Sequence, residues 1–439
     1  MAEAARLSPA PGSVPPNPAT NGSQGVVEAK RLDGHRHDHL TDDTRRGMPL
    51  YAPGMLRPIL LILAGSGLLA VSFRVEPTWV SRHVVQLHAW PPLDFATAQR
   101  IQSTIVWALS IGAVTLFAVA AVIRWGSGQM KFASVLRIAL AILCAFASTE
   151  IYLRWRAWIH PRPKMTQEIF GRLHPRYGWV WTPSLAATEL VAGRSVGLAF
   201  NRESIRVRNP AEELDSKAPS ILFTGESIAA GQGLQYEETF AALVSGELGF
   251  QPVNLAVNGY GCDQAYLRLI DALPRFDRLF ATVTTFLPVQ LGRNLQDLKP
   301  RLVLTDGGTL QALPAATGFL SRLRLRRLLF NELPYSTDRG IAATIALTRA
   351  ILRDTVNRTE ARGGKAVFLI PLQGPARRLE EHGEAWLIRS IFEAEGIPYV
   401  LIDLDESMLL PGDPHPSPRG AKLIASALLD ALAHRAAAR

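Results

Sequence analysis

Apolar residues are distributed unevenly along the chain, and their spacing divides it into four parts. Residues 1–50 are rich in Pro, Gly, Ala, Asn and charged residues and show no apolar period, so we expect a disordered polar tail. Residues 51–155 contain three long apolar runs, residues 156–217 mix short β-prone pieces with a linker, and residues 218–439 alternate short apolar runs with amphipathic ones. The pattern predicts a tail, a membrane region, a small β-rich segment and one larger domain.

The three runs of the membrane region span about 56–73, 101–123 and 132–153. A transmembrane helix needs about 20 mainly apolar residues, and each run is close to that length. The middle run contains no charged residue and is apolar on every side, which is unlike a helix in the core of a soluble protein. Small residues such as Gly65 and Gly112 would allow neighbouring helices to approach closely. We therefore expect three transmembrane helices.

Positive charge near the ends of these runs predicts their orientation, because Lys and Arg gather on the cytoplasmic side. The flanking cations on one side are Arg45, Arg46, Arg57, Arg124, Lys131 and Arg137. The opposing cations in the first loop are Arg74, Arg82 and Arg100. We give the first group the greater weight and place it in the cytoplasm. We therefore expect a multi-pass inner-membrane protein whose C-terminal domain is periplasmic or otherwise extracytoplasmic. If the first run does not span, that domain would be cytoplasmic.

Composition agrees with a membrane protein more than with a nucleic-acid-binding one. The 439 residues carry 47 Lys and Arg against 38 Asp and Glu, a formal net charge of +9. The mean hydropathy of +0.10 is high for a soluble protein, and the apolar residues are concentrated early. Cys144 and Cys262 lie in different segments, so no disulfide is expected. Because His35, His37 and His39 have no second ligand cluster, we expect no metal, and the sequence, which has no phosphate-binding glycine loop, implies no organic cofactor.

The rhythm of strand, turn and helix predicts the fold of residues 218–439. Expected strands are Ile221–Thr224, Pro252–Val257, Leu279–Phe286, Ala366–Ile370 and Tyr399–Ile402. Expected helices are Glu238–Leu248, Cys262–Ala272, Asp338–Thr359, Ala376–Ala394 and Pro418–Ala437. Short apolar strands between amphipathic helices indicate a parallel five-stranded sheet covered on both faces, a flavodoxin-like three-layer αβα sandwich. Ligands of such sheets bind beyond the carboxyl ends of the strands.

Ser227, Asp413 and His415 are the residues of this domain that could carry chemistry. Ser227 follows the first expected strand, and a serine hydroxyl becomes a nucleophile only beside a base. A histidine is the usual base, and a carboxylate fixes its tautomer. Asp413 and His415 are two residues apart, so in an extended segment they project to the same side. Ser417 and Pro418 suit the start of the helix that follows.

Each of these pieces alone has a simpler explanation. Ser227 would serve as a helix N-cap, and Asp413 with His415 would be a polar loop before a helix. Their presence at opposite ends of one α/β domain favours a serine hydrolase over these explanations.

Several motifs resemble those of the GDSL or SGNH hydrolases, which are esterases and acyl-modifying enzymes built on a three-layer αβα sheet. Gly225-Glu226-Ser227 resembles their Gly-Asp-Ser opening, and 254–261 looks like their second block, whose glycine supplies an oxyanion-hole N–H. Asp413-Pro414-His415 is similar to their final block, and the resemblance covers about 220–433. It implies a Ser227–His415–Asp413 triad, with an oxyanion hole made by the Ser227 and Gly259 backbone amides.

The third block departs from the family pattern. After the third strand the family has an Asn that donates to the oxyanion, whereas here residues 287–294 read Leu-Pro-Val-Gln-Leu-Gly-Arg-Asn. Gln290 carries the same amide on a longer stem, and Asn294 is a more distant alternative. Loss of one oxyanion donor costs on the order of a hundred- to a thousand-fold in rate. Gln290 therefore serves as the third donor, or the hole has two donors, or the enzyme is slow.

These observations predict a membrane-anchored serine ester hydrolase that acts on O-acyl esters such as acetyl esters. Placement outside the cytoplasm suggests envelope glycans or lipids as the acylated substrates. One alternative is an O-acyltransferase, in which a sugar hydroxyl replaces water and the same three residues act. Another is a catalytically weak domain that only binds acylated glycans, which the missing Asn supports.

Overall fold

Five parallel strands form the central sheet in the order β11-β10-β7-β5-β6. Their bounds are β5 (Ser220–Thr224), β6 (Gln251–Asn254), β7 (Leu279–Thr285), β10 (Lys365–Gln373) and β11 (Tyr399–Leu404). All five predicted strands are present. The predicted second strand is too long at its end, because the Asn254 side chain accepts a hydrogen bond from Ala256 N (3.1 Å) and turns the chain out of the sheet. The parallel sheet of the sequence-based prediction is confirmed.

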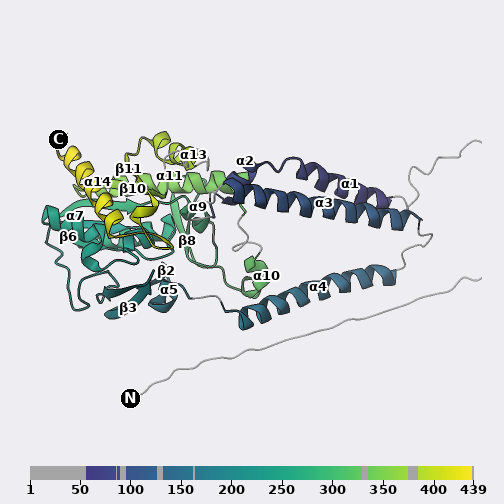
Figure 1. Ribbon diagram of the computed structural model, residues 1–439, viewed down its shortest axis with the longest axis horizontal. Coiled ribbons are helices and arrows are strands. Elements are labelled where there is room, and N and C mark those ends of the chain that lie inside the picture. The colour runs from purple at the N-terminus through teal and green to yellow at the C-terminus, as the bar shows by residue number, and fades with distance from the viewer. Residues whose placement is uncertain are drawn as a thin grey trace, which may run out of the picture. The chain divides into compact units, whose positions relative to one another are not determined.

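This description comes from a computed structural model, shown in Figure 1. It describes residues 56–85, 87–88, 95–125, 132–161, 164–328, 335–373 and 384–437. The predicted tail of residues 1–50 and its three histidines lie outside these ranges. The part of the predicted helix 376–394 that precedes Glu384 also lies outside them.

Helices flank the sheet, and alternate side chains of each strand separate its two faces. On β10, Val367 and Leu369 join the core cluster of α7 (Phe240–Leu248) and α14 (Pro418–Ala437). Phe368, between them, joins the cluster of the helices on the other face. The main elements of that cluster are α8 (Cys262–Ala272), α11 (Asp338–Glu360) and α13 (Glu384–Ile391). Because both faces are covered, the strands read as continuous apolar runs rather than alternating ones.

Two β-hairpins precede the sheet within residues 156–217. They pair β1 (Gly171–His174) with β2 (Gly178–Trp181), and β3 (Leu185–Val191) with β4 (Arg194–Phe200). Arg206 links the second hairpin to the sheet, because it bridges Phe200 on one side and Asn254 of β6 on the other. The edge of β6 is therefore covered at this point, which hinders pairing with another chain.

Shorter elements fill the connections between the strands. They are α5 (Thr166–Ile169), α6 (Ser227–Ala230), η2 (Tyr236–Glu238), η3 (Leu273–Arg275), α9 (Val289–Asn294), β8 (Arg301–Leu304), β9 (Leu310–Leu313), η4 (Leu320–Arg322), α10 (Arg324–Arg327), η6 (Glu393–Glu395), η7 (Glu406–Met408), β12 (Leu409–Leu410) and β13 (Asp413–Pro416). Of these, α6, α9 and β13 lie at or beyond the carboxyl ends of the strands and carry the residues discussed below.

The first two apolar runs form helices that pack against each other. They are α1 (Leu56–Ser72) and α3 (Phe95–Trp125), joined through α2 (Pro77–Val80) and the π-helical turn η1 (Ser81–Val85). A Cβ on Gly65 would lie 2.7 Å from the Phe117 ring, and one on Gly112 would lie 3.3 Å from Leu68. These two glycines therefore permit the close approach that their small size predicts.

The prediction of three transmembrane helices is supported only in part. Within the described residues, Thr97–Arg124 is one helix long and apolar enough to cross a membrane. The first run reaches a comparable length only when Leu56–Ser72 is joined to Pro77–Val85 across a 91° bend. The third run lies in α4 (Phe132–Ile159), which also contains Glu150 and Arg154. By length and composition, the described residues contain one helix that could cross a membrane, or two if the bent pair forms one span.

Large apolar side chains point outward from these helices. Trp107 and Val122 on α3 are 69% and 71% exposed, and Leu143 and Trp158 on α4 are 65% and 79% exposed. Soluble proteins rarely leave apolar surface of this extent uncovered. Exposed apolar surface of this kind is typical of sites that contact a membrane or another protein.

The loop between α1 and α3 contacts the C-terminal domain. His83 Nδ1 lies 2.7 Å from Ser336 O, and His88 Nε2 lies 3.0 Å from Ser336 Oγ. Leu87 is buried in the same apolar cluster as residues of α8 and α11. Its carbonyl oxygen packs closely on Gly292 of α9, since a Cβ added to Gly292 would lie 2.0 Å from that oxygen. These contacts therefore join the loop to α9, α8 and α11.

Candidate active site

Ser227 lies on a tight turn between β5 and α6. Every residue of β5 is buried, and the strand ends at Gly225, whose φ of +142° is open to glycine. A Cβ at Gly225 would lie 2.9 Å from the Thr285 Cβ on β7, so the turn leaves no room for a larger residue. Glu226 is the N-cap of α6, since its carboxylate accepts a hydrogen bond from Ile228 N (3.1 Å). Ser227 is the first helical residue, so the N-cap role considered for it belongs to Glu226.

Asp413 and His415 lie on β13, which pairs antiparallel with β12. Their side chains project to the same side, as the extended spacing predicts. Asp413 Oδ1 accepts hydrogen bonds from the His415 backbone N–H (2.9 Å) and lies 2.5 Å from Nδ1 of its ring. Ser417 caps α14 through its Oγ, which accepts from Gly420 N (3.3 Å), and α14 begins at Pro418. The predicted helix start after His415 is therefore confirmed.

The structure brings Ser227, His415 and Asp413 into one hydrogen-bonded chain. His415 Nε2 lies 2.8 Å from Ser227 Oγ, and Nδ1 of the same ring faces Asp413. Ser227 and His415 are each 7% exposed, so the contact is shielded from most of the solvent. Residues 188 positions apart meet here because α6 and β13 both lie at the carboxyl edge of the sheet. An imidazole in this position can accept the serine proton while the carboxylate fixes its tautomer.

Asp413 is held in its charged form by its histidine partner. Burial by itself would raise the pKa of Asp413, but hydrogen bonds from the His415 ring and backbone, with the charge of His415, bring the pKa below its ordinary value. The carboxylate therefore stays ionised throughout the neutral range. An ionised Asp413 favours a proton on Nδ1 of His415, and in that tautomer Nε2 can accept a hydrogen bond from Ser227.

Glu226 is a second partner of the Ser227 hydroxyl that the sequence did not reveal. Glu226 Oε2 lies 2.6 Å from Ser227 Oγ, and the hydroxyl has a single proton for Glu226 and His415. If Ser227 donates to Glu226, the His415 ring must be protonated on both nitrogens to keep its hydrogen bonds to Asp413 and to Ser227. If it donates to His415, the ring is neutral and able to act as a base. The position of this one proton therefore separates a resting arrangement from a reactive one.

The expected oxyanion donors lie on neighbouring loops that are tied together. Val257 N donates to Gly225 O (3.3 Å), and Asn258 Nδ2 donates to Gln232 Oε1 (2.7 Å). Gly259 has a φ of +80°, a left-handed backbone conformation that favours glycine at this position. In the described structure, neither the Ser227 N–H nor the Gly259 N–H has a protein acceptor. Both donors are thus unoccupied and available to a substrate oxygen.

Gln290 and Asn294 were the two candidates for the third donor, and neither presents an amide to solvent. Gln290 Oε1 accepts from Leu287 N (3.0 Å) and lies 3.5 Å from Cys262 Sγ. Its Nε2 is sealed from solvent and has no partner in the described part of the chain. Asn294 Nδ2 donates to Thr348 Oγ1 (3.3 Å), and its oxygen accepts from Asp263 N (3.3 Å). Asn294 therefore ties α9 to α8 and α11, and Gln290 would have to leave its present rotamer to reach a substrate.

Aromatic residues of the first hairpin support the Gly259 loop. Trp179 Nε1 donates to Asn258 O (3.0 Å), and Trp181 Nε1 donates to Ala256 O (3.0 Å). Tyr260 OH in turn bonds to Trp179 O. The aromatic segment 177–181 was expected to pack beside the main domain, but its sequence alone does not identify the loop that it holds.

Arg206 supports the other loop by holding the C-terminal end of α6. Its guanidinium is buried and donates to Ala230 O, to Gly231 O (2.7 Å) and to Leu234 O (2.5 Å). Burial lowers the pKa of Arg206 to about 10, so it remains a cation at neutral pH. A cation at a helix C-terminus stabilises the exposed carbonyls. Arg206 is a positioning residue for the turn that carries Ser227.

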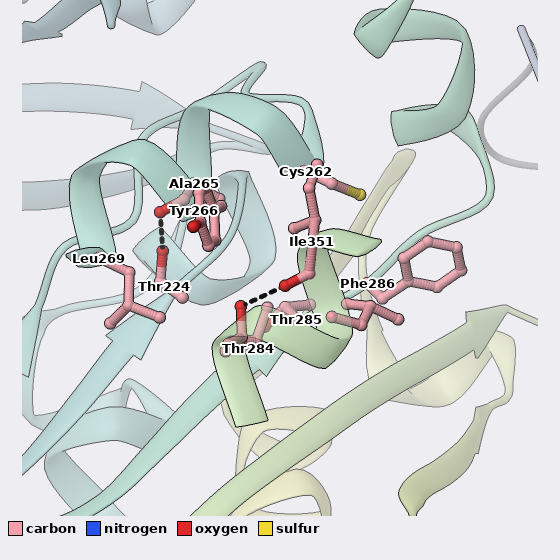
Figure 2. Close-up of a pocket in the computed structure, with 11 residues that line it drawn as sticks. Thr224, Cys262, Ala265, Tyr266, Leu269, Thr284, Thr285, Phe286 and Ile351 are labelled. Carbon is pink, nitrogen blue, oxygen red and sulfur yellow. Dashed lines mark hydrogen bonds between the residues drawn. The ribbon is translucent and has the colours of Figure 1, made fainter. Parts of the chain in front are cut away.

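A small cavity of about 10 Å³ lies within the core, away from these residues. Figure 2 shows it between the sheet and two helices, with Thr224 bonded to Ala265 O of α8 (3.1 Å). A cavity of this size holds about one water molecule, so it is too small for a substrate. Across the described ranges, no group of three or more His, Cys, Asp or Glu is placed to hold a metal ion.

Comparisons with known proteins give weak similarities. No family model matches the chain, and no curated protein matches it. Among solved structures, it is similar to an acetyl xylan esterase from Butyrivibrio proteoclasticus (12% identity, TM-score 0.30, 52% of this chain and 66% of that one). It is also similar to a putative lipolytic protein of the G-D-S-L family from Desulfitobacterium hafniense DCB-2 (11% identity, TM-score 0.28, 48% and 98%).

A third similar structure is a carbohydrate esterase described as having divergent catalytic and non-catalytic binding functions (13% identity, TM-score 0.29, 51% and 67%). The chain spans about two thirds of this protein and of the acetyl xylan esterase. These identities and TM-scores are too low to assign a family or an activity. The functional proposal below depends on the geometry of the chain's own residues.

Proposed function

We propose that the C-terminal domain is a serine ester hydrolase of SGNH type. The observation that carries this proposal is the single imidazole of His415, which contacts Ser227 Oγ on one side (2.8 Å) and Asp413 on the other (2.5 Å). A nucleophile, a base and an orienting carboxylate in this order are what acyl transfer to serine requires. The same three residues, found by motif in the sequence, are brought together from distant parts of the chain.

In the proposed reaction, Ser227 Oγ attacks the carbonyl carbon of an ester while His415 Nε2 takes the hydroxyl proton. The carbonyl π electrons move onto oxygen, and the Ser227 and Gly259 N–H groups stabilise the resulting oxyanion. His415 then gives the proton to the leaving alkoxide, and the alcohol departs from an acyl-enzyme. Water attacks the acyl carbon with His415 as base, which releases the acid and restores Ser227.

The proposal predicts turnover of small O-acetyl esters by the purified full-length protein. We expect acetate release from p-nitrophenyl acetate and from an O-acetylated sugar, measured in the same detergent. Adding a free sugar as acceptor separates the two enzyme classes. An undiminished rate of acetate release indicates a hydrolase, whereas acetate transfer to the added sugar indicates the transferase. Saturable binding of the acetylated sugar without turnover would contradict both and would favour the binding domain.

We propose further that the domain is held outside the cytoplasm. The contacts of His83 and His88 with Ser336 support a topology in which the α1–α3 loop lies on the same side of the membrane as the domain. The chain therefore crosses an even number of times between them, which is met when α3 and α4 both span. The short loop between α3 and α4, flanked by Arg124, Lys131 and Arg137, then lies on the opposite side. Positive charge favours the cytoplasm for that loop. Acylated envelope glycans or lipids would be accessible to a domain placed in this way.

Reporter fusions test this orientation. Alkaline phosphatase fused after Arg439 is expected to be active, because that enzyme folds only outside the cytoplasm. The matched control is a fusion in the α3–α4 loop, where we expect phosphatase to be silent and a fluorescent protein to be bright. The reverse pattern at both sites would place the domain in the cytoplasm.

A further inference from the structure

Three neighbouring strands place three loops around the Ser227 hydroxyl, and only two of these loops have an assigned role. In the sheet, β7 lies next to β5, and β5 lies next to β6. Ser227 follows β5 and Gly259 follows β6, while α9 follows β7. The third loop is therefore adjacent to the nucleophile turn, and its residues are the natural source of a further donor. Gln290 on α9 keeps its amide nitrogen sealed in the core, as described above.

Arg293 is the cation of this third loop, and it contacts the loop that carries the Gly259 donor. Its Nη1 donates to Tyr260 O (3.0 Å), the carbonyl next to Gly259. Burial lowers the pKa of Arg293 below its ordinary value, and the charge of Glu226, the residue before Ser227, partly opposes this shift. The guanidinium is thus held by a hydrogen bond next to Gly259, and it is attracted by the carboxylate of Glu226 next to Ser227. Glu226 is fully buried and Arg293 is half-buried, so little solvent screens the attraction between their charges.

The rest of the Arg293 guanidinium remains open. Its Nε and Nη2 have no acceptor in the part of the chain that the structure describes. Neither atom is among the buried nitrogens that lack a partner, so both reach solvent. A guanidinium fixed at Nη1 and open at Nε and Nη2 presents a rigid pair of donors. That pair can accept a ligand oxygen without first breaking a bond to the protein.

We propose that Arg293 is the third oxyanion donor of this active site, in place of an amide side chain. This proposal rests on the esterase function proposed above. When Ser227 Oγ bonds to the carbonyl carbon and the π electrons move to oxygen, the new negative charge is shared by the Ser227 and Gly259 N–H groups and by Arg293. A positive charge held in place before the reaction stabilises such an oxygen more than it stabilises the neutral ester. Arg293 therefore acts on kcat more than on KM.

Two other roles for Arg293 give different kinetics. A residue that binds an anionic group of the substrate acts equally on ground state and transition state, so its loss raises KM and leaves kcat unchanged. If Arg293 only holds the Tyr260 carbonyl in place, its loss would lower thermal stability without a specific effect on the oxyanion. The proposed role predicts a loss of kcat that an added cation can restore.

The test compares Arg293→Met, Arg293→Lys and Arg293→Ala with the wild type, as full-length protein in one detergent. Arg293→Met is expected to lower kcat on p-nitrophenyl acetate on the order of a hundred- to a thousand-fold, with KM nearly unchanged. Phosphonylation of Ser227 by a fluorophosphonate, which also places charge on an oxygen in the hole, is expected to slow by a similar factor. Arg293→Lys keeps the charge and is expected to retain more activity than Arg293→Met. Guanidinium ion is expected to restore part of the rate of Arg293→Ala.

Arg353→Met is the matched control, because Arg353 is an exposed cation of α11 that pairs with Glu395 (2.7 Å), and its loss is expected to leave kcat unchanged. A wild type that fails to react with the fluorophosphonate overturns the proposed function and this inference with it. A reactive wild type with an equally reactive Arg293→Met overturns this inference alone. A rise in KM at constant kcat, or a loss that guanidinium fails to relieve and that matches a fall in Tm, also overturns it.

Discussion

Ser227→Ala is expected to abolish ester hydrolysis and fluorophosphonate labelling, with a fall in kcat on the order of a million-fold. The loss is this large because no other group in the site can form the acyl-enzyme. Glu226 is an acceptor and not an attacking group in this geometry, and Cys262 is buried, which raises the pKa of its thiol to about 12. Without a covalent intermediate, the remaining backbone donors stabilise only a slow direct attack by water. Labelling is measured by intact mass and by the modified peptide.

Ser245→Ala is the matched control for this prediction. Ser245 Oγ on α7 is buried and has no partner in the described structure, so removing it removes an unsatisfied polar atom. We expect the wild-type labelling rate and an unchanged or slightly higher Tm. If the wild type labels no faster than Ser227→Ala, the serine is not a nucleophile, and both the hydrolase and the transferase are excluded. Labelling at a serine other than Ser227 would also contradict the assignment.

The sheet and its helices could be predicted because local sequence and tertiary position agree there. The bounds of α8 and α14 match the sequence-based prediction, since Gly261 precedes the first and Ser417 with Pro418 begins the second. Buried strands such as β5 read as short apolar runs between turn residues. The convergence of Ser227 with Asp413 and His415 follows from the same sheet. Residues beyond the carboxyl ends of parallel strands are neighbours whatever their separation in sequence.

The parts that could not be predicted depend on rotamers or on contacts between distant segments. The bond from Ser227 to Glu226 depends on how the turn directs two adjacent side chains. The Gln290 side chain turns its amide nitrogen into the core because its Oε1 contacts Leu287 N and Cys262 Sγ, and Cys262 lies on a different helix. Trp179 reaches Asn258 across 79 positions, and no periodicity encodes that pairing. The sequence gives no reason to prefer Arg293 to another surface cation, because its bond to Tyr260 O joins residues 33 positions apart.

The membrane region shows the limit of a count of apolar residues. The first run has a length that suggests a span, but the helix ends at Ser72 and the next segment turns by 91°. Pro77 begins that segment, because proline cannot continue a helix from its interior but suits a first turn. The number of apolar residues alone does not predict such a bend. The contacts of His83 and His88 with Ser336 join this segment to residues about 250 positions later, and the sequence contains no sign of these contacts.

Asp413→Asn is expected to lower kcat on the order of ten-thousand-fold while leaving the fold intact. In the wild type one oxygen, Asp413 Oδ1, contacts both the His415 backbone N–H (2.9 Å) and Nδ1 of the ring (2.5 Å). An asparagine that turns its NH2 group to this place loses the bond from the backbone N–H and donates to Nδ1 instead, so that the neutral imidazole carries its proton on Nε2. In that tautomer Nε2 faces Ser227 Oγ as a donor and cannot take the hydroxyl proton. The rate is measured with p-nitrophenyl acetate at neutral pH, and Asp430→Asn on the exposed side of α14 is the control.

The same substitution has a pH signature in stability whose sign follows from the electrostatics. Burial opposes the charge of Asp413, but the bonds from His415 prevail, so its pKa is lower in the folded protein than in the unfolded chain. A lowered carboxyl pKa stabilises the fold at pH values above its unfolded pKa, and this contribution is lost as the pH falls through the folded pKa. The Tm of Asp413→Asn should therefore lie below that of the wild type at neutral pH, and the difference should shrink on acidification. A difference that stays constant with pH, together with near-wild-type kcat, would mean that Asp413 neither orients His415 nor pairs with it.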